Sequence, residues 1–253
     1  MRMRAISEEQ IESFKADGYL HLPRYLDESA LDATKQALKK VMDKINTFRS
    51  EEIYYEDKED PASLKQIQHL ENKEEFFQHL ISTGTVYELA QELLQEEPIP
   101  KNIQYFNKPP KHSSATPAHQ DGYYFMLNPC RALTMWLALE EVDESNGCIS
   151  YVRSSHRLGV RKHQRTKTLG FSQGIADFPS PKDQAQLVKI KAQPGDLLVH
   201  DAMTIHSADK NRSTRTRKAI GFIYYAASAQ VDEVAHAAYQ QQLANDLRKE
   251  NKI

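Results

Sequence analysis

The stretch that decides the fold runs from residue 194 to residue 222 and reads PGDLLVHDAMTIHSADKNRSTRTRKAIGF. It opens on a Pro-Gly-Asp turn, which is followed by an apolar strand at about 197–200 and a second strand at about 219–225. Earlier runs of β-branched and aromatic residues predict further strands at 103–106, 133–139, 148–152 and 187–190. Six or more strands with few helices between them predict an antiparallel sandwich or barrel.

Before residue 100 the composition is typical of helices instead. Ser7 to Gln10 form a capping box at the start of a helix over about 7–17, and apolar residues at a spacing of three and four after Asp27 predict a second, long helix that reaches Ile45. The remaining expectations are a strand at 19–22, an exposed charged loop at 49–60, a helical region at 74–94 and a last helix at 231–249. The sequence therefore predicts a mainly β core with helices on its outside.

The length predicts one domain, although two small ones are also compatible with it. The chain has 253 residues, of which 40% are apolar and 27% charged, enough for one sizeable core. We expect a single domain over 1–253, with a mostly helical flank at 1–100, the β core at 101–228 and a C-terminal helix at 229–253.

Charge and cysteine content exclude several classes of function. The formal net charge of −2 offers no field to hold a polyanion, so we expect no nucleic-acid partner. Apolar stretches are no longer than a strand, which predicts no membrane span. Two cysteines and the absence of a secretory leader pattern favour a reducing, cytoplasmic setting. The oligomeric state is not readable from the sequence.

Three residues in the strand-rich half form a candidate metal site. His119 and Asp121 are two positions apart, so an extended segment would place both side chains on one face. With His206 they complete the two-histidine, one-carboxylate set of non-haem Fe(II) oxygenases, and Arg217 would serve a dicarboxylate cosubstrate. A His-x-Asp pair alone is a common coincidence, and His200 is a rival histidine for which we favour a core or supporting role.

The chain resembles the phytanoyl-CoA dioxygenase family of iron(II)- and 2-oxoglutarate-dependent oxygenases over nearly its whole length. The Trp136 strand carries the resemblance together with these motifs: FKADGYLHLPRYLD (14–27), LKQIQHLENKEEFF (64–77), NKPP (107–110), HQDGYYF (119–125), SNGCISYVRSSH (145–156) and residues 194–220. The resemblance implies a double-stranded β-helix (jelly roll, cupin-like) core. It also implies Fe(II), 2-oxoglutarate and O2 as cofactor and cosubstrates, and hydroxylation of an unactivated C–H bond of a small-molecule metabolite with release of succinate and CO2.

Carried to this chain, the resemblance implies a role for each matching residue. His119, Asp121 and His206 would ligate the iron as the catalytic centre, and Arg217 would bind the distal carboxylate of 2-oxoglutarate through its guanidinium fork. Three further residues would line the cosubstrate pocket: Lys65, Gln104 and Trp136. The alternatives are a solvated surface lysine for Lys65 and core packing for Trp136.

The sequence departs from the family pattern at two positions. Gln104 stands where an apolar residue is expected, and Ala208 stands where the family has a serine, with Ser207 beside it. Arg215 is a rival to Arg217 but is two residues off the family spacing. The carboxylate of Asp121 favours hydroxylation, since related halogenases have a small residue there.

Other features leave alternatives open. The basic segment from Arg153 to Lys167 is either a solvated loop or a clamp for an anionic substrate, and alternate residues among 123–125 are expected to face the pocket. The substrate is either a small polar metabolite, which we favour, or an acyl-CoA. A non-catalytic ligand-binding or sensor protein on the same fold, and a zinc hydrolase using the same three ligands, are the competing functions.

Overall fold

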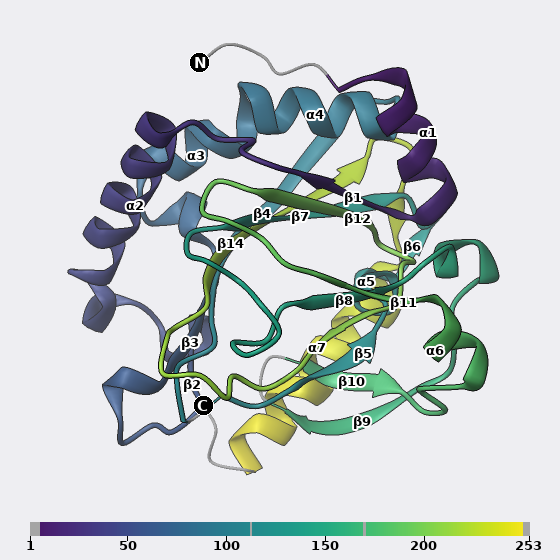
Figure 1. Cartoon of the computed structure of the whole chain (residues 1–253). Coiled ribbons are helices and arrows are strands. Elements are labelled where there is room, and N and C mark those ends of the chain that lie inside the picture. The colour runs from purple at the N-terminus through teal and green to yellow at the C-terminus, as the bar shows by residue number, and fades with distance from the viewer. Residues whose placement is uncertain (1–5, 112, 169–170, 250–253) are drawn as a thin grey trace.

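Two facing antiparallel sheets form the centre of the molecule in the computed structural model, which describes residues 6–111, 113–168 and 171–249 (Figure 1). The larger sheet has the strand order β1 (Tyr19–Leu22), β12 (Leu197–Asp201), β7 (Ala132–Ala138), β14 (Lys218–Ala226), β4 (Pro98–Asn107), β3 (Leu64–Ile67) and β2 (Ile53–Tyr55). The smaller has the order β11 (Leu187–Ile190), β8 (Ile149–Val152), β13 (His206–Ala208) and β5 (Thr116–His119). This pair of sheets is the double-stranded β-helix that the resemblance implies.

Helices and two short strand pairs surround the sheets. The strand pairs are β9 (His163–Thr168) with β10 (Phe171–Ile175), and β6 (Leu127–Asn128) with β15 (Gln230–Val231). The α-helices are α1 (Glu8–Asp17), α2 (Glu28–Met42), α3 (Glu75–Ser82), α4 (Thr85–Leu94), α5 (Asp121–Phe125), α6 (Pro181–Gln186) and α7 (Glu233–Lys249). Single 3₁₀ turns occur at Ile45–Thr47, Ser50–Glu52, Pro61–Ser63, Leu70–Asn72 and Ser155–Leu158. Among the described residues, no helix has the length and apolar character needed to cross a membrane.

The large sheet is covered on both faces, and alternation along its strands decides what each face carries. Leu133, Met135 and Leu137 of β7 pack with apolar residues of α1 to α4 in the main core. The intervening Trp136 and Ala138 face the small sheet and pack in a separate cluster between the sheets. Figure 1 shows α2, α3 and α4 on one side of the large sheet and the small sheet on the other. The space between the sheets is therefore lined by every second residue of each strand.

The predicted elements differ from the observed ones in both halves of the chain. In the second half the structure adds β5, β9, β10 and β13 and the helices α5 and α6. The stretch 49–60 is not all loop, because residues 53–55 form β2, and β2 and β3 extend the large sheet from within the expected helical flank. The helical region 74–94 is two helices, α3 and α4, separated at Gly84, which has a φ of +78°. The strand expected at 19–22 and the Ser7 cap of the first helix are as predicted.

Candidate active site

Two histidines face each other across paired strands of the small sheet. His119 is the last residue of β5 and His206 the first of β13, directly opposite in register, with 4.2 Å between their ring centroids. The Nδ1 of His119 lies 2.7 Å from the Pro117 carbonyl oxygen, and the Nδ1 of His206 lies 3.0 Å from that of Thr204. Since each Nδ1–H donates to a carbonyl oxygen, each Nε2 keeps its lone pair for a ligand.

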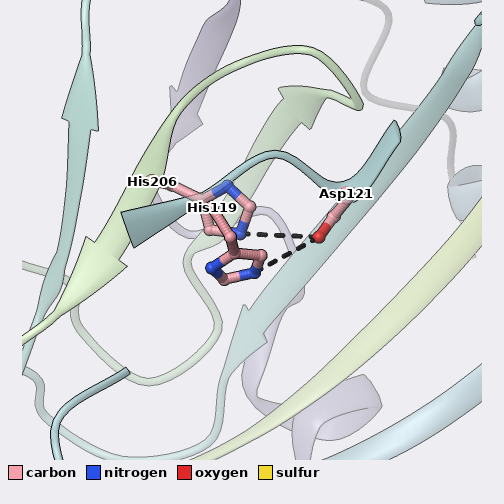
Figure 2. Close-up of side chains that lie close together, drawn as sticks. All are labelled: His119, Asp121 and His206. Carbon is pink, nitrogen blue, oxygen red and sulfur yellow. Dashed lines mark ion pairs between the residues drawn. The ribbon is translucent and has the colours of Figure 1, made fainter. Parts of the chain in front are cut away.

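Asp121 completes the group from the first position of α5. Its Oδ1 lies 3.4 Å from the Nε2 of His119 and 3.7 Å from the Nε2 of His206, and the three ligand atoms lie within 4.8 Å of one another (Figure 2). The expectation that His119 and Asp121 share one extended strand is wrong in detail, because the strand ends at His119 and a helix begins at Asp121. The extended backbone of Gln120 still brings both side chains to the same place.

The second oxygen of Asp121 is held by the large sheet. Thr134 Oγ1 donates to Asp121 Oδ2 at 2.5 Å, and His200 Nε2 lies 3.2 Å from the same atom. His200 and Thr134 are themselves cross-strand partners on β12 and β7, and the Tyr151 hydroxyl lies 3.0 Å from His200 Nδ1. The two oxygens of the Asp121 carboxylate therefore have different partners: Oδ2 is bound by protein groups, and Oδ1 faces the two Nε2 atoms.

His200 thus has the supporting role that the sequence favours, whereas Thr134 and Tyr151 were not singled out. The signal for Thr134 was present, because the strand at 133–139 places it on the same face as Trp136. No pattern near Tyr151 points to His200, since this contact joins two strands far apart in the sequence.

The protonation states favour metal binding. Burial raises the pKa of Asp121, but His206, His119 and His200 together lower it further, so that the net pKa is well below the ordinary value. Burial, followed by the neighbouring His119 and His200, holds the pKa of His206 well below its usual range. A neutral imidazole and an ionised carboxylate are the forms that a metal ion requires.

Arg217 is a buried cation beside this group. It lies one residue before β14, is 5% exposed, and its guanidinium carbon lies 5.1 Å from the centre of the Trp136 ring. Its Nε has no hydrogen-bond partner among the described residues, and burial lowers the pKa of the guanidinium to about 10. The rival Arg215 is half-exposed and forms ion pairs with Glu141 and Asp143. Arg217 therefore has the position for an anionic ligand.

Lys65 is not a solvated surface lysine. Its Nζ lies 3.1 Å from Glu56 Oε1, and both side chains are buried. The same carboxylate accepts from the Ser114 backbone N–H at 2.9 Å, while Lys108 Nζ donates to the Ser114 carbonyl at 2.6 Å. Burial, with Arg217 and Lys65 nearby, lowers the pKa of Lys108 well below its usual value. Lys108, in the NKPP motif, is a second buried lysine that the sequence analysis did not single out.

Gln104 and Trp136 occupy neighbouring positions across three strands. Gln104 pairs with Gly221, and Gly221 pairs with Trp136. A Cβ atom at Gly221 would lie 2.7 Å from the Phe106 ring, so glycine leaves the space that this ring fills. A cavity of about 600 Å³ is lined by all seven residues that the sequence proposes: His119, Asp121, His206, Arg217, Lys65, Gln104 and Trp136. Ser207 and Ala208 also line it.

The basic segment from Arg153 to Lys167 is held mostly by the protein itself. Arg153 forms an ion pair with Asp17 at 3.5 Å, and Arg161 binds Asp183 at 2.8 Å. Arg165 lines the cavity, and the Lys167 side chain lies outside the described residues. Among the described basic side chains of this segment, Arg165 is the one that lines the cavity, and the clamp stays a prediction.

Residues 123–125 lie on α5 rather than on a strand, so their expected strand alternation does not apply. Tyr124 and Phe125 line the cavity, whereas Tyr123 stacks on His163 with 4.1 Å between the rings.

The residues present fit an iron ion and a dicarboxylate. Two imidazole nitrogens and one carboxylate oxygen facing a common point are the donor set of non-haem Fe(II) sites. The unpartnered Nε of the buried Arg217 lies in the same cavity, where a carboxylate would neutralise the cation and satisfy its donors.

This fold and donor set define the Fe(II)- and 2-oxoglutarate-dependent oxygenase superfamily. Within it, the family model for phytanoyl-CoA dioxygenase matches residues 14–219, and the chain belongs to this family. The peroxisomal phytanoyl-CoA dioxygenase of Mus musculus is 29% identical over 149 residues, which are 56% of this chain and 43% of that protein. Phytanoyl-CoA dioxygenase 1 of Oryza sativa subsp. japonica is 24% identical, covering 85% of this chain and 88% of that one.

Solved structures agree on the fold. The non-heme alpha-ketoglutarate-dependent carbocyclase SnoK from nogalamycin biosynthesis superposes with a TM-score of 0.72 at 25% identity, covering 92% of this chain and 90% of that one. EctD from S. alaskensis with bound Fe has a TM-score of 0.75 at 19% identity, covering 90% and 79%. A further EctD structure holds 2-oxoglutarate and 5-hydroxyectoine. Between them, the EctD structures hold iron, 2-oxoglutarate and a small molecule on this scaffold.

Proposed function

We propose that this protein is an Fe(II)- and 2-oxoglutarate-dependent hydroxylase of a small-molecule metabolite, converting 2-oxoglutarate to succinate and CO2 as it inserts one oxygen atom into a C–H bond. The observation that carries the proposal is that the His119, Asp121 and His206 ligand atoms share one cavity with the buried Arg217. Solved relatives that bind iron and 2-oxoglutarate support the choice of metal and cosubstrate.

In this proposal the chain's own residues bind and orient the reactants. The Nε2 atoms of His119 and His206 and the Oδ1 of Asp121 would hold iron on one side, leaving the other side open. When bound, iron with 2-oxoglutarate and O2 supplies the oxidising chemistry. Thr134 and His200 hold Asp121 Oδ2, which keeps the carboxylate in one orientation.

Arg217 would pair with the distal carboxylate of 2-oxoglutarate, and its guanidinium lies over the Trp136 ring, 5.1 Å from the ring centre. Lys65 and Gln104 line the same cavity and are proposed to contact the cosubstrate. Since Lys65 is already paired with Glu56, we expect its effect on 2-oxoglutarate affinity to be smaller than that of Arg217.

The test is an anaerobic titration of the apoprotein with Fe(II) and then 2-oxoglutarate, following the visible metal-to-keto-acid charge-transfer band. Wild type should develop the band, and Asp121→Ala should shift or weaken it because one of the three protein ligands is gone. Arg215→Ala is the matched control for Arg217→Ala, because Arg215 pairs with surface carboxylates instead. A folded wild type that shows no band would contradict the proposal and favour a zinc hydrolase or a ligand-binding protein.

A second candidate reaction is a redox rearrangement without net hydroxylation. It is favoured by the similarity to SnoK, described as a carbocyclase, and to SnoN, described as an epimerase, with a TM-score of 0.70 at 23% identity. Product masses distinguish the two, because hydroxylation adds an oxygen atom that isotopically labelled O2 traces. A product without added oxygen would replace hydroxylation by rearrangement.

A further inference from the structure

Carboxamide side chains line the same cavity as the metal ligands. Gln66 of β3 and Asn102 and Gln104 of β4 line it, and we call these three residues the carboxamide wall. The alternation of β4 explains the placement, because Ile103 and Tyr105 point into the helix-side core and their neighbours face the cavity.

The carboxamide wall has uncommitted hydrogen-bonding groups. Gln66 Nε2 donates to Gln104 Oε1 at 2.6 Å, whereas Gln66 Oε1 and Asn102 Oδ1 have no partner among the described residues. Gln66 is 3% exposed, and a buried acceptor without a donor is unfavourable. When two carboxamides share a single hydrogen bond, one carbonyl oxygen and the remaining N–H groups are not used within the pair. A ligand group that both donates and accepts, such as a hydroxyl or an amide, satisfies them.

The charges of the lining restrict the ligand further. Among the described residues that line the cavity, Asp121 is the one acid, and it faces the metal position. Lys101 and Arg165 lie on the same lining. A cationic substrate would therefore meet no free carboxylate, while a neutral or anionic one meets a favourable field.

The carboxamide wall itself is unsuited to a long acyl chain, although aromatic side chains such as Phe106 and Phe125 give the cavity apolar surface elsewhere. The branched aliphatic side chains of the lining are Ile149 and Ile223, among the described residues. Methylene groups in contact with the carboxamide wall would exclude water from its polar groups without forming hydrogen bonds to them, which is unfavourable.

We propose that the carboxamide wall binds a neutral or anionic substrate rich in hydroxyl or amide groups and that it selects against a saturated acyl chain. The inference rests on the proposed function, since the substrate has to lie in the same cavity as the iron and 2-oxoglutarate. Gln66 becomes a specificity-determining residue, and Gln104 contributes through its hydrogen bond to Gln66.

The test adds probes to the anaerobic complex of protein, Fe(II) and 2-oxoglutarate, and then measures succinate formation in air. The first pair is gluconate and hexanoate, which have equal charge and chain length but differ in hydroxyl groups. The second pair is N-acetylglucosamine 6-phosphate and palmitoyl-CoA. Gluconate and the amino-sugar phosphate should perturb the charge-transfer band and raise succinate formation, and the two acyl compounds should do neither.

Variants locate the effect on the wall. Gln66→Leu should weaken the response to the polar probes about tenfold, the equivalent of about 1.4 kcal/mol, while the charge-transfer band with 2-oxoglutarate still forms. Gln66→Met serves as a second variant if the first fails to fold. Gln91→Leu, an exposed glutamine on α4, is the matched control and should behave as wild type.

The outcomes separate the two proposals. If wild type shows no charge-transfer band, the proposed function fails. If the band forms but hexanoate or palmitoyl-CoA stimulates turnover, or if neither polar probe has any effect, the inference on the carboxamide wall is wrong and the oxygenase assignment stands.

Discussion

Arg217 differs from the arginines of the basic segment, Arg153 to Lys167, in whether the protein supplies partners for the charged group. Arg217 is buried against Trp136, and its Nε has no hydrogen-bond partner among the described residues. In the segment, Arg161 binds Asp183 and Arg157 donates to the Lys15 carbonyl. A cation left unsatisfied in a buried cavity indicates a ligand, whereas a cation already paired by the protein indicates structure. Local density of positive charge in the sequence does not distinguish these cases.

The largest effect should come from Arg217→Ala. Loss of two charge-assisted hydrogen bonds, each about 1.5–3 kcal/mol, should lower 2-oxoglutarate affinity by about 100-fold or more. Titration of the charge-transfer band measures it. Arg217→Lys should retain part of the affinity, because an ammonium keeps the charge but not the fork. If the Arg217→Ala protein bound 2-oxoglutarate like wild type, Arg217 would not be a ligand-binding cation, and it would no longer differ in role from the arginines of the basic segment.

Arg161→Ala should have the opposite profile, with a loss of stability and no loss of cosubstrate affinity. The change removes the arginine that binds both oxygens of Asp183, which is 5% exposed and keeps the hydrogen bond from the Ser180 N–H, and should lower the free energy of unfolding by about 1–3 kcal/mol. Urea denaturation measures this, with the 2-oxoglutarate titration alongside. If Arg161→Ala weakened 2-oxoglutarate binding in a folded protein, the segment would have to be counted as part of the site.

The Arg161 contribution should also depend on pH. Burial raises the pKa of Asp183, but Arg161 and Ser180 lower it further, so the folded pKa lies below the unfolded value of about 3.9. Such a group stabilises the folded state above the unfolded pKa and loses this effect as the pH falls through the folded pKa. The difference in stability between wild type and Arg161→Ala should therefore be full at pH 7 and shrink below about pH 4. Urea denaturation across this range checks it, and a constant difference would argue against the carboxylate.

Arg153→Ala should have the smallest effect. Its ion pair with Asp17 spans 3.5 Å and the Arg153 side chain is 47% exposed, a type of pair that contributes about 0–1 kcal/mol. We expect a change in unfolding free energy under about 0.5 kcal/mol and unchanged 2-oxoglutarate affinity. A large loss of either would show that this end of the segment does more than anchor α1.

Much of this arrangement could be predicted from the sequence, and the exceptions have physical reasons. Strands such as 187–190 were readable because alternation is a local signal, whereas the ligand set was proposed from the His-x-Asp pair together with the resemblance to a known family. The sequence could not predict that Asp121 Oδ2 is bound by the protein while Oδ1 faces the metal position. Thr134 and His200 contact Oδ2 only because strands that are distant in the sequence pair with each other. The strand at 53–55 was missed because its charged flanks resemble a loop and only the neighbouring β3 orders it.

His119 and His206 are directly opposite each other on β5 and β13, and this pairing affects which parts of the cavity can vary in sequence. The two residues are 87 positions apart in the chain (206 minus 119), yet strand register alone fixes their separation. The intervening chain includes the β9–β10 hairpin, which supplies Arg165, Thr166, Thr168 and Ser172 to the cavity. Substitutions at these four positions can therefore alter which molecules the cavity accepts while the register that opposes the two histidines stays the same.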